Sequence, residues 1–309
     1  MLHIYPLINN GYSFILLPMQ ILDGKTVANS VKEQIIAETI AHKNAKGHTP
    51  HLAAILIGND GASETYVASK IKNCADVGFK STLIRFDATA TEQEITEAVI
   101  KLNEDDDVNG ILVQLPLPKH INEASIINLI NPAKDVDGFH PISVGKLVQG
   151  LETFIPATPF GIMLMLQHYQ IETSGKHAVV IGRSNIVGRP MSILLSQNTE
   201  YGNCTVTLCH SRTKDLEKIC AGADIIVAAL GIPGFLTADM VKEGAVVIDV
   251  GITRVADSSK KSGYAIKGDV DFENVASKCS FITPVPGGVG LMTIAALLKN
   301  TLAAASGKQ

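Results

Sequence analysis

Residues 177–197, "HAVVIGRSNIVGRPMSILLSQ", combine a short apolar run, a glycine-containing turn and a second apolar segment. The apolar run predicts a strand that ends at Gly182, and the segment after Gly188 predicts a helix. A tight turn between a strand and a helix N-terminus leaves backbone N–H groups free to bind a pyrophosphate. The strict G-x-G-x-x-G pattern is not met, because position 184 is serine and position 187 is valine. An ordinary strand–helix turn is the alternative for this stretch alone.

The next predicted strand, "CTVTLCHSRT" at 204–213, ends in polar and basic residues. Sites for NAD usually place an acidic side chain here to bind the ribose hydroxyl. This chain has Ser211 and Arg212 instead, with Arg183 in the preceding turn. A guanidinium pairs with a phosphate, whereas a carboxylate would repel it. The pattern therefore favours NADP over NAD as the nucleotide.

Predicted strands and helices alternate along nearly the whole chain. Before residue 150, apolar runs at 51–58, 79–86 and 109–118 are separated by segments with helical spacing. After that point, further short apolar runs follow the first nucleotide-type strand, at 223–231, 244–251 and 280–288. Repeated β-α units predict parallel sheets covered by helices. We expect the α/β class, with two α/β domains around a cleft and the second domain of Rossmann type.

The boundary between the domains is predicted at "TFIPATPFGIMLMLQHY", residues 153–169, where two prolines precede an apolar helix. The first domain is then 19–158 and the Rossmann domain 159–286. The apolar C-terminal helix, within 287–309, is expected to cross back and complete the first domain. The sequence contains no internal repeat or low-complexity segment.

Residues 1–18 are apolar but contain no lysine or arginine, which a signal peptide would carry before its apolar core. Asn9, Asn10 and Gly11 interrupt the run well short of a membrane span. We interpret this segment as an upstream extension, with Met19 as the natural start. The alternative is an N-terminal arm that packs on a partner subunit.

Composition excludes several classes of function. The 309 residues carry a formal net charge of −4 without a basic block, so nucleic acid and anionic membranes are poor partners. The five cysteines are odd in number and lack C-x-x-C spacing, which argues against disulfides and zinc and favours a reduced, cytoplasmic location. The nine histidines show no H-E-x-x-H motif, so we expect no protein-bound metal.

A tyrosine and a lysine stand four residues apart in "ETYVASK", residues 64–70. Tyr66 and Lys70 would be neighbours on one face of a helix predicted over 62–78, with Ser63 as N-cap and Gly78 after its end. Short-chain dehydrogenases use this spacing, but their nucleotide glycines precede the pair. Here Gly182 follows it by more than 100 residues. The order excludes that class and leaves a cleft-edge pair or a surface tyrosine covering a lysine stem.

Two further polar positions complete the candidate site. Gln114 lies near the carboxyl end of an apolar strand, where ligands bind in open α/β sheets, and Lys70 is its candidate partner. Its alternative is a bond to nearby backbone. In "KDVDGFHP", residues 134–141, Asp135 and Asp137 could accept paired N–H donors from a planar heterocycle. Their alternative is a role as turn or capping residues.

Six ordered motifs resemble the bifunctional methylenetetrahydrofolate dehydrogenase/methenyltetrahydrofolate cyclohydrolases. They are "TYVASK", "VQLPLP", "KDVDGFHP", "GRSNIVGRP", "VIDVGI" and "PVPGGVG". The resemblance extends from Met19 to about Leu302. It departs at Leu291, where the family usually has proline, and at Thr253, where it usually has asparagine.

The resemblance implies oxidation of 5,10-methylenetetrahydrofolate with NADP, followed by hydrolysis to 10-formyltetrahydrofolate. It implies that Lys70 is the general acid/base and that Gln114 orients it. Tyr66 would stack on the folate, and Asp137 would hold the pterin. The residues implied to line the NADP side are Gly182, Arg183, Ser184, Ser211 and Ile252.

The resemblance also implies a homodimer in one-carbon metabolism, serving purine and amino-acid biosynthesis. Three alternatives stay open. The first is a monofunctional NADP-dependent methylenetetrahydrofolate dehydrogenase, which the joint presence of Lys70 and Gln114 disfavours. The others are an NADP oxidoreductase with an unrelated substrate and a non-catalytic NADP-binding regulatory protein.

Overall fold

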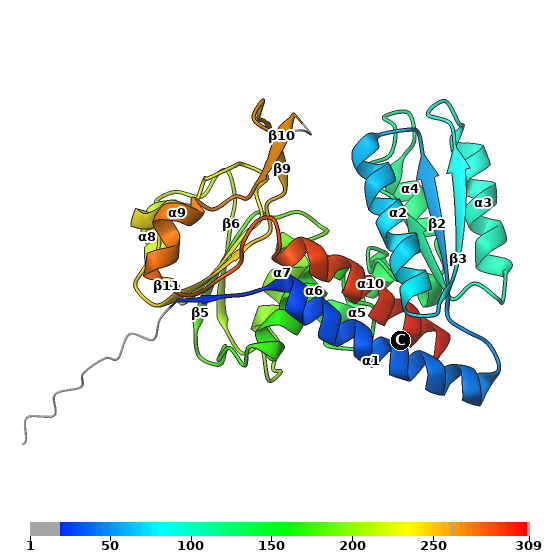
Figure 1. Ribbon diagram of the computed structural model, residues 1–309, viewed down its shortest axis with the longest axis horizontal. Coiled ribbons are helices and arrows are strands. Elements are labelled where there is room, and N and C mark those ends of the chain that lie inside the picture. Colours follow the sequence, from blue (N-terminus) through cyan, green and yellow to red (C-terminus); the bar gives the residue numbers. More distant parts are fainter. Residues whose placement is uncertain (1–18, 261–262, 308–309) are drawn as a thin grey trace, which may run out of the picture.

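A computed structural model describes residues 19–260 and 263–307. Figure 1 shows two α/β halves, each built around its own sheet, joined by long helices that run between them. The interpretation of residues 1–18 as an upstream extension falls outside the described residues. The predicted α/β class is confirmed, with two separate parallel sheets and one two-stranded hairpin.

The smaller sheet has three parallel strands in the order β3-β2-β4. The central strand, β2 (His51–Ile57), is buried along its whole length, as expected for a parallel strand covered on both faces. Its neighbours are β3 (Lys80–Phe86) and β4 (Gly110–Val113). The helices of this half are α2 (Gly61–Asp76), α3 (Glu92–Glu104), α4 (Glu123–Leu129) and α5 (Pro141–Val148), with the short η1 (Pro132–Lys134) before α5.

The larger sheet is parallel, with the order β1-β11-β8-β7-β5-β6. Its strands are β1 (Gln20–Ile21), β5 (His177–Ile181), β6 (Thr205–Cys209), β7 (Ile225–Ala228), β8 (Ala245–Asp249) and β11 (Cys279–Ile282). The chain runs from β5 to β6 on one side and then returns to β7 on the other. Ligands of doubly wound sheets bind beyond the carboxyl ends of the strands at such a switch point.

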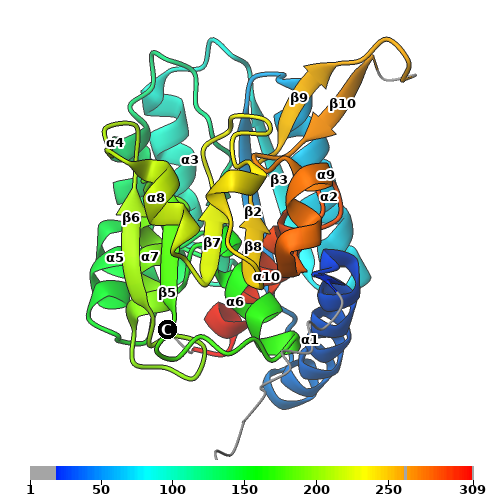
Figure 2. The same ribbon diagram turned by 90° about the vertical axis from the view of Figure 1, so that its left-hand side faces the viewer.

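The larger sheet is surrounded by short helices and one hairpin (Figure 2). The helices are α7 (Gly188–Ser196), α8 (Leu216–Ala221) and α9 (Phe272–Val275), with the 3₁₀ turns η2 (Ala238–Met240) and η3 (Ala276–Lys278). The hairpin pairs β9 (Thr253–Ala256) with β10 (Tyr264–Lys267) and projects from the sheet. The sequence did not indicate this hairpin.

Three helices connect the halves: α1 (Gly24–Lys46), α6 (Ala157–His168) and α10 (Val289–Ala305). They pack on one another between the two sheets (Figure 1). Near the end of α10, the buried Asn300 donates from Nδ2 to the carbonyl oxygens of Val136 at 2.8 Å and Ile155 at 2.9 Å. These bonds attach the end of α10 to two points of the segment between η1 and α6.

Local predictions were correct at some element ends and wrong at others. Thr91 and Glu94 form a capping box at the start of α3, and Gly78 adopts the left-handed conformation expected after α2. Ser63 is not the N-cap of α2. Asp60 takes that place, and its carboxylate accepts a bond from the Ser63 N–H at 2.8 Å. Because an acidic side chain can cap as well as serine, the N-cap lies three residues earlier than expected.

Two assignments along the chain need revision. The strand predicted over 109–118 ends at Val113, so Gln114 lies just past its carboxyl end. β1 pairs with β11 in the larger sheet, although residue 19 onward was assigned to the first domain. We keep the division into 19–158 with the C-terminal helix and 159–286 as a proposal, with β1 moved to the second sheet.

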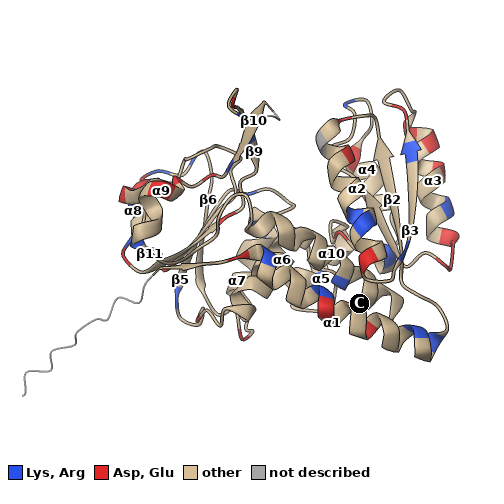
Figure 3. Ribbon diagram, in the orientation of Figure 1, with Lys and Arg blue, Asp and Glu red and all other residues tan. Residues whose placement is uncertain are grey.

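Charges are spread over the surface rather than gathered. Figure 3 shows acidic and basic residues interspersed on α1 and α3. Within the described residues, no helix is long and apolar enough to cross a membrane.

Candidate active site

One pocket brings together residues from both halves of the molecule. It lies where α2, the end of β4, the 135–140 loop and the helices α6 and α10 meet the turn after β5. Its lining residues are Tyr66, Lys70, Gln114, Leu115, Asp137, Phe139, Ala157, Thr158, Ile186 and Thr293. Ile186 belongs to the predicted nucleotide-binding turn, so this pocket adjoins the cofactor region.

Lys70 is buried, with only 5% of its surface exposed. Its Nζ donates to Oε1 of Gln114 at 3.1 Å, which confirms the predicted pairing. The amide nitrogen of Gln114 donates to the carbonyl oxygen of Leu115 at 2.7 Å. This second bond fixes the amide orientation, so that an uncharged acceptor faces the lysine.

The surroundings favour neutral Lys70. Burial lowers the pKa of Lys70, and the nearby Asp137 charge opposes this shift only in part. Burial also raises the pKa of Asp137 to about 6, although the Lys70 charge acts in the opposite direction. A buried amine with an uncharged hydrogen-bond partner loses its proton more readily than a free lysine does, which a general base requires.

The Tyr66 ring lies beside the Lys70 amine. The Lys70 Nζ lies 5.0 Å from the centre of the Tyr66 ring. Burial raises the pKa of the Tyr66 phenol, and a hydrogen bond with Thr293 opposes the shift. The Thr293 hydroxyl is in turn 3.2 Å from that of Thr158. The phenol is thus held protonated and in place, which suits a positioning role better than proton transfer.

The two aspartates of the 134–141 loop have different roles. Asp135 is buried and accepts bonds from the Ser143 hydroxyl at 2.7 Å and from the backbone N–H groups of His140 and Phe139 at 2.9 and 3.2 Å. Its alternative as a turn-capping residue is the correct one. Asp137 instead lines the pocket. Asp135 therefore shapes the loop, and Asp137 is free to meet a ligand.

The turn after β5 has glycines where the backbone packs closely against itself. Gly182 has φ of +119°, and a Cβ there would lie 2.1 Å from the Ala229 carbonyl oxygen. A Cβ on Gly188 would lie 1.9 Å from the Gly182 carbonyl oxygen. Ser184 accepts bonds from the N–H groups of Val187 and Gly188 at 3.1 and 3.3 Å, and so holds the turn in shape. The turn leads directly into the N-terminus of α7, the kind of position at which a pyrophosphate binds.

The predicted phosphate-recognition residues lie at one edge of the sheet. Ile181 of β5 pairs with Cys209 of β6, and Arg183 and Ser211 each follow two residues later. Both are exposed. Because parallel strands end at the same edge, the two side chains flank the same region beyond the sheet.

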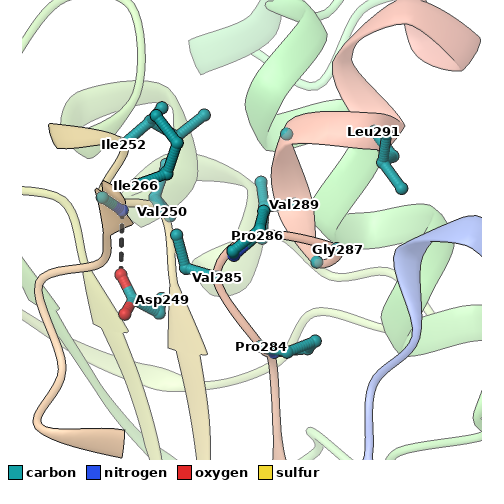
Figure 4. Close-up of a pocket in the computed structure, with 13 residues that line it drawn as sticks. Asp249, Val250, Ile252, Ile266, Pro284, Val285, Pro286, Gly287, Val289 and Leu291 are labelled. Atoms are coloured by element: carbon teal, nitrogen blue, oxygen red, sulfur yellow. Dashed lines mark hydrogen bonds between the residues drawn. The ribbon is translucent and has the colours of Figure 1, made fainter. Parts of the chain in front are cut away.

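Ile252 follows β8 at that edge and is 58% exposed. It lines a second, mainly apolar pocket together with the 284–291 segment (Figure 4). Leu291, the residue that replaces the usual proline, also lines this pocket. Leu291 therefore lies beside the predicted cofactor region and outside the pocket that contains Lys70, which is called the lysine pocket below.

Two family models match the chain. The Tetrahydrofolate dehydrogenase/cyclohydrolase catalytic domain matches residues 22–137, and the NAD(P)-binding domain of the same family matches residues 156–309. The chain belongs to the tetrahydrofolate dehydrogenase/cyclohydrolase family. The NAD(P)-binding match includes α10, which packs between the two halves.

Relatives cover nearly the whole chain. "Bifunctional protein FolD" of Flavobacterium johnsoniae is 62% identical over 286 residues, 93% of this chain and 97% of the relative. The protein of the same name from Bacteroides fragilis is 60% identical over 289 residues, 93% of this chain and 98% of the relative. These matches confirm the predicted family and the bifunctional dehydrogenase and cyclohydrolase class.

Solved structures of family members agree with the fold. The bifunctional enzyme of Campylobacter jejuni has a TM-score of 0.87 at 49% identity and covers 93% of this chain and 99% of its own. The Trypanosoma brucei dehydrogenase-cyclohydrolase, complexed with NADP and an inhibitor, has a TM-score of 0.89 at 38% identity and covers 94% of this chain and 98% of its own. The predicted two-domain fold with a nicotinamide nucleotide domain is confirmed.

Proposed function

We propose that this family member oxidises 5,10-methylenetetrahydrofolate to the methenyl cation with NADP⁺ and then hydrolyses the cation to 10-formyltetrahydrofolate. The observation that carries the proposal is the buried Lys70 amine, bonded to the uncharged Gln114 amide in a pocket that adjoins the nucleotide turn. The first reaction needs a cofactor beside the folate, and the second needs a base.

NADP⁺, when bound, supplies the hydride acceptor. In the hydrolysis, the neutral Nζ of Lys70 takes a proton from a water molecule as its oxygen bonds to the methenyl carbon. The ammonium then returns the proton to the folate nitrogen as the C–N bond breaks. Gln114 holds the amine in place through both transfers without adding a charge that would keep it protonated.

Two other residues hold the substrate. Asp137 accepts N–H donors of the pterin, and Tyr66 stacks against the ring system. The Thr293 and Thr158 hydroxyls support the phenol, so helices α10 and α6 help to set the position of the folate. Both threonines escaped sequence reasoning, although Thr293 stands just after the "PVPGGVG" motif.

Recognition of NADP rather than NAD is assigned to Arg183 and Ser211, with Gly182 and Ser184 shaping the pyrophosphate turn and Ile252 beside the nicotinamide. The exposed guanidinium and hydroxyl are free to meet the 2′-phosphate, and no carboxylate stands at either position. The Trypanosoma brucei relative was solved in complex with NADP, which supports the choice of nucleotide.

A two-wavelength assay tests the function. Purified protein is mixed with methylenetetrahydrofolate and NADP⁺, and absorbance is followed for NADPH and for the methenyl product. The proposal expects NADPH to accumulate while the methenyl band stays low. A persistent methenyl band would indicate the monofunctional dehydrogenase, and no change at either wavelength would indicate a binding protein.

We also propose a homodimer in the cytoplasm, supplying one-carbon units to purine and amino-acid synthesis. The five cysteines are free and buried, which suits a reducing compartment. Sedimentation of the purified protein would test the dimer, since a monomer at micromolar concentration would contradict it.

A further inference from the structure

A second buried acidic side chain lies at the end of β8, away from the lysine pocket. Asp249 is 3% exposed, and its carboxylate accepts bonds from three backbone N–H groups. They belong to Gly251 at 2.9 Å, Asp269 at 2.8 Å and Val270 at 3.0 Å. Figure 4 shows Asp249 beneath Ile252, with one of these bonds drawn. One carboxylate thus joins the turn after β8 to the 268–270 segment.

Asp269 extends the network to the next strand. It is fully buried, and one of its carboxylate oxygens accepts bonds from the N–H groups of Leu230 at 2.6 Å and Gly231 at 2.9 Å. Those residues follow β7. Among the described residues, its other oxygen has no hydrogen-bond partner. Two buried acidic side chains therefore fix the loops after β7 and β8, the two strands that follow the switch point.

Placing two carboxylates together inside a protein is unfavourable. Burial and the Asp269 charge raise the pKa of Asp249 to about 6. The surrounding chain is fitted to this arrangement, because a Cβ on Gly268 would lie 2.0 Å from Oδ2 of Asp249. An apolar side chain in place of Asp249 would leave three buried backbone N–H groups without an acceptor. The carboxylate is therefore what holds these loops in their arrangement.

The loops that the pair fixes lie on the cofactor side. Gly182 and its turn follow β5, which pairs with β7. Asp249 and Ile252 line the same apolar pocket after β8. If the 2′-phosphate lies near β6, the nicotinamide half of the cofactor extends over β7 and β8. This direction also leads toward the pocket that contains Lys70, which Ile186 lines.

On the basis of the proposed function, we propose that Asp249, supported by Asp269, is a positioning residue for the nicotinamide half of the cofactor. The Asp249 carboxylate holds Gly251 and the 269–270 segment, and the Asp269 carboxylate holds the loop after β7, in the arrangement that receives the ring. Asp249 does not touch the lysine pocket, so the hydrolysis reaction should not depend on it.

The variants Asp249→Asn and Asp269→Asn test this role. In Asp249→Asn, the single amide oxygen can accept either from the Gly251 and Asp269 N–H groups or from the Val270 N–H. In both orientations the NH₂ group faces a remaining N–H donor, so at least one hydrogen bond is lost. Asp224→Asn is a matched control. Asp224 also accepts a backbone bond, from the His177 N–H at 2.7 Å, but at the opposite end of the sheet. Each full-length protein is measured for NADPH binding by fluorescence titration, for melting temperature and for hydrolysis of methenyltetrahydrofolate.

We expect Asp249→Asn to raise the Kd for NADPH on the order of tenfold, the effect of one lost buried hydrogen bond. Hydrolysis, which uses no nicotinamide, should continue near the wild-type rate. Asp224→Asn should lower the melting temperature and leave the Kd unchanged. Asp269→Asn should also raise the Kd for NADPH. If Asp249→Asn does not fold, the Asp269→Asn result alone tests the proposal.

Three results would overturn the inference. They are wild-type affinity for NADPH in the folded Asp249 and Asp269 variants, an equal loss of affinity in Asp224→Asn, and a loss of hydrolysis that parallels the loss of binding. Wild-type protein that does not bind NADPH would instead contradict the proposed function.

Discussion

Replacing the Gln114 amide by a carboxylate tests whether the lysine acts as a neutral base. Gln114→Glu has nearly the same shape and places a negative charge where Oε1 now lies, 3.1 Å from the Lys70 Nζ. At this distance the attraction is about 5 kcal/mol with an effective dielectric constant near 20, before the cost of burying the new carboxylate. Opposite charges this close usually shift a pKa by about 1–3 units.

The expected consequence is a slower reaction that recovers in alkali. Each unit by which the lysine pKa rises reduces the neutral fraction about tenfold at pH values below that pKa. The hydrolysis rate of Gln114→Glu at pH 7.5 should therefore fall by about ten- to a thousandfold. Its pH–rate profile should move to higher pH by about 1–3 units, because the lysine then deprotonates later.

The assay is the decay of the methenyl absorbance between pH 6 and pH 10. Gln149→Glu, which adds the same charge on the exposed end of α5, serves as the control and should follow the wild-type profile. A folded Gln114→Glu enzyme with the wild-type rate and pH profile would refute the argument, because the lysine charge would then not matter. A uniform loss of rate at every pH would assign Gln114 to substrate contact instead.

Three further outcomes follow from the same residues. Lys70→Met keeps the apolar stem and removes the amine, so hydrolysis should fall by a factor of about 10²–10⁴, and near wild-type decay of the methenyl band would contradict the assignment. Arg183→Ala should raise the KM for NADP⁺ by about 10- to 100-fold and leave that for NAD⁺ nearly unchanged. Arg189→Ala, which removes a guanidinium bonded to Asn185 at 3.1 Å, is its control, and equal effects on both nucleotides would remove Arg183 from the phosphate site. Because burial raises the pKa of Asp137 to about 6, its side chain should become protonated and lose its negative charge as the pH falls through about 6 rather than about 4. The KM for methenyltetrahydrofolate should rise below that pH, and Asp137→Asn should give a KM that is higher and does not vary between pH 5 and pH 8.

The fold was predictable where burial alone determines the structure. β2 is an apolar run covered on both faces, and the capping box of Thr91 and Glu94 is a local signal that needs no tertiary contact. The β9–β10 hairpin and β1 gave no such signal. Their residues are largely exposed, and β1 is only two residues long, so its strand character comes from pairing with β11 at the far end of the chain.

The lysine pocket was predictable because its residues carry strong chemical signals. A lysine, a glutamine in an apolar strand and an aspartate in a tight loop each need a partner, and parallel strands bring such positions to one edge. Sequence alone could not distinguish Asp135 from Asp137. The difference is that Ser143 and two N–H groups converge on Asp135 only, and that depends on how the loop folds back.

Asp249 shows the opposite case. In the sequence it ends an apolar run, "VVID", and resembles any aspartate that closes a buried strand. Its three partners lie at Gly251 and, some twenty residues later, at Asp269 and Val270. The intervening hairpin must fold back before they meet. A short polar signal therefore identifies residues that act by direct contact with a ligand. Residues that position the backbone can be recognised only when the loops after separate strands are placed together. At this edge of the sheet, Asp249 and Asp269 hold those loops.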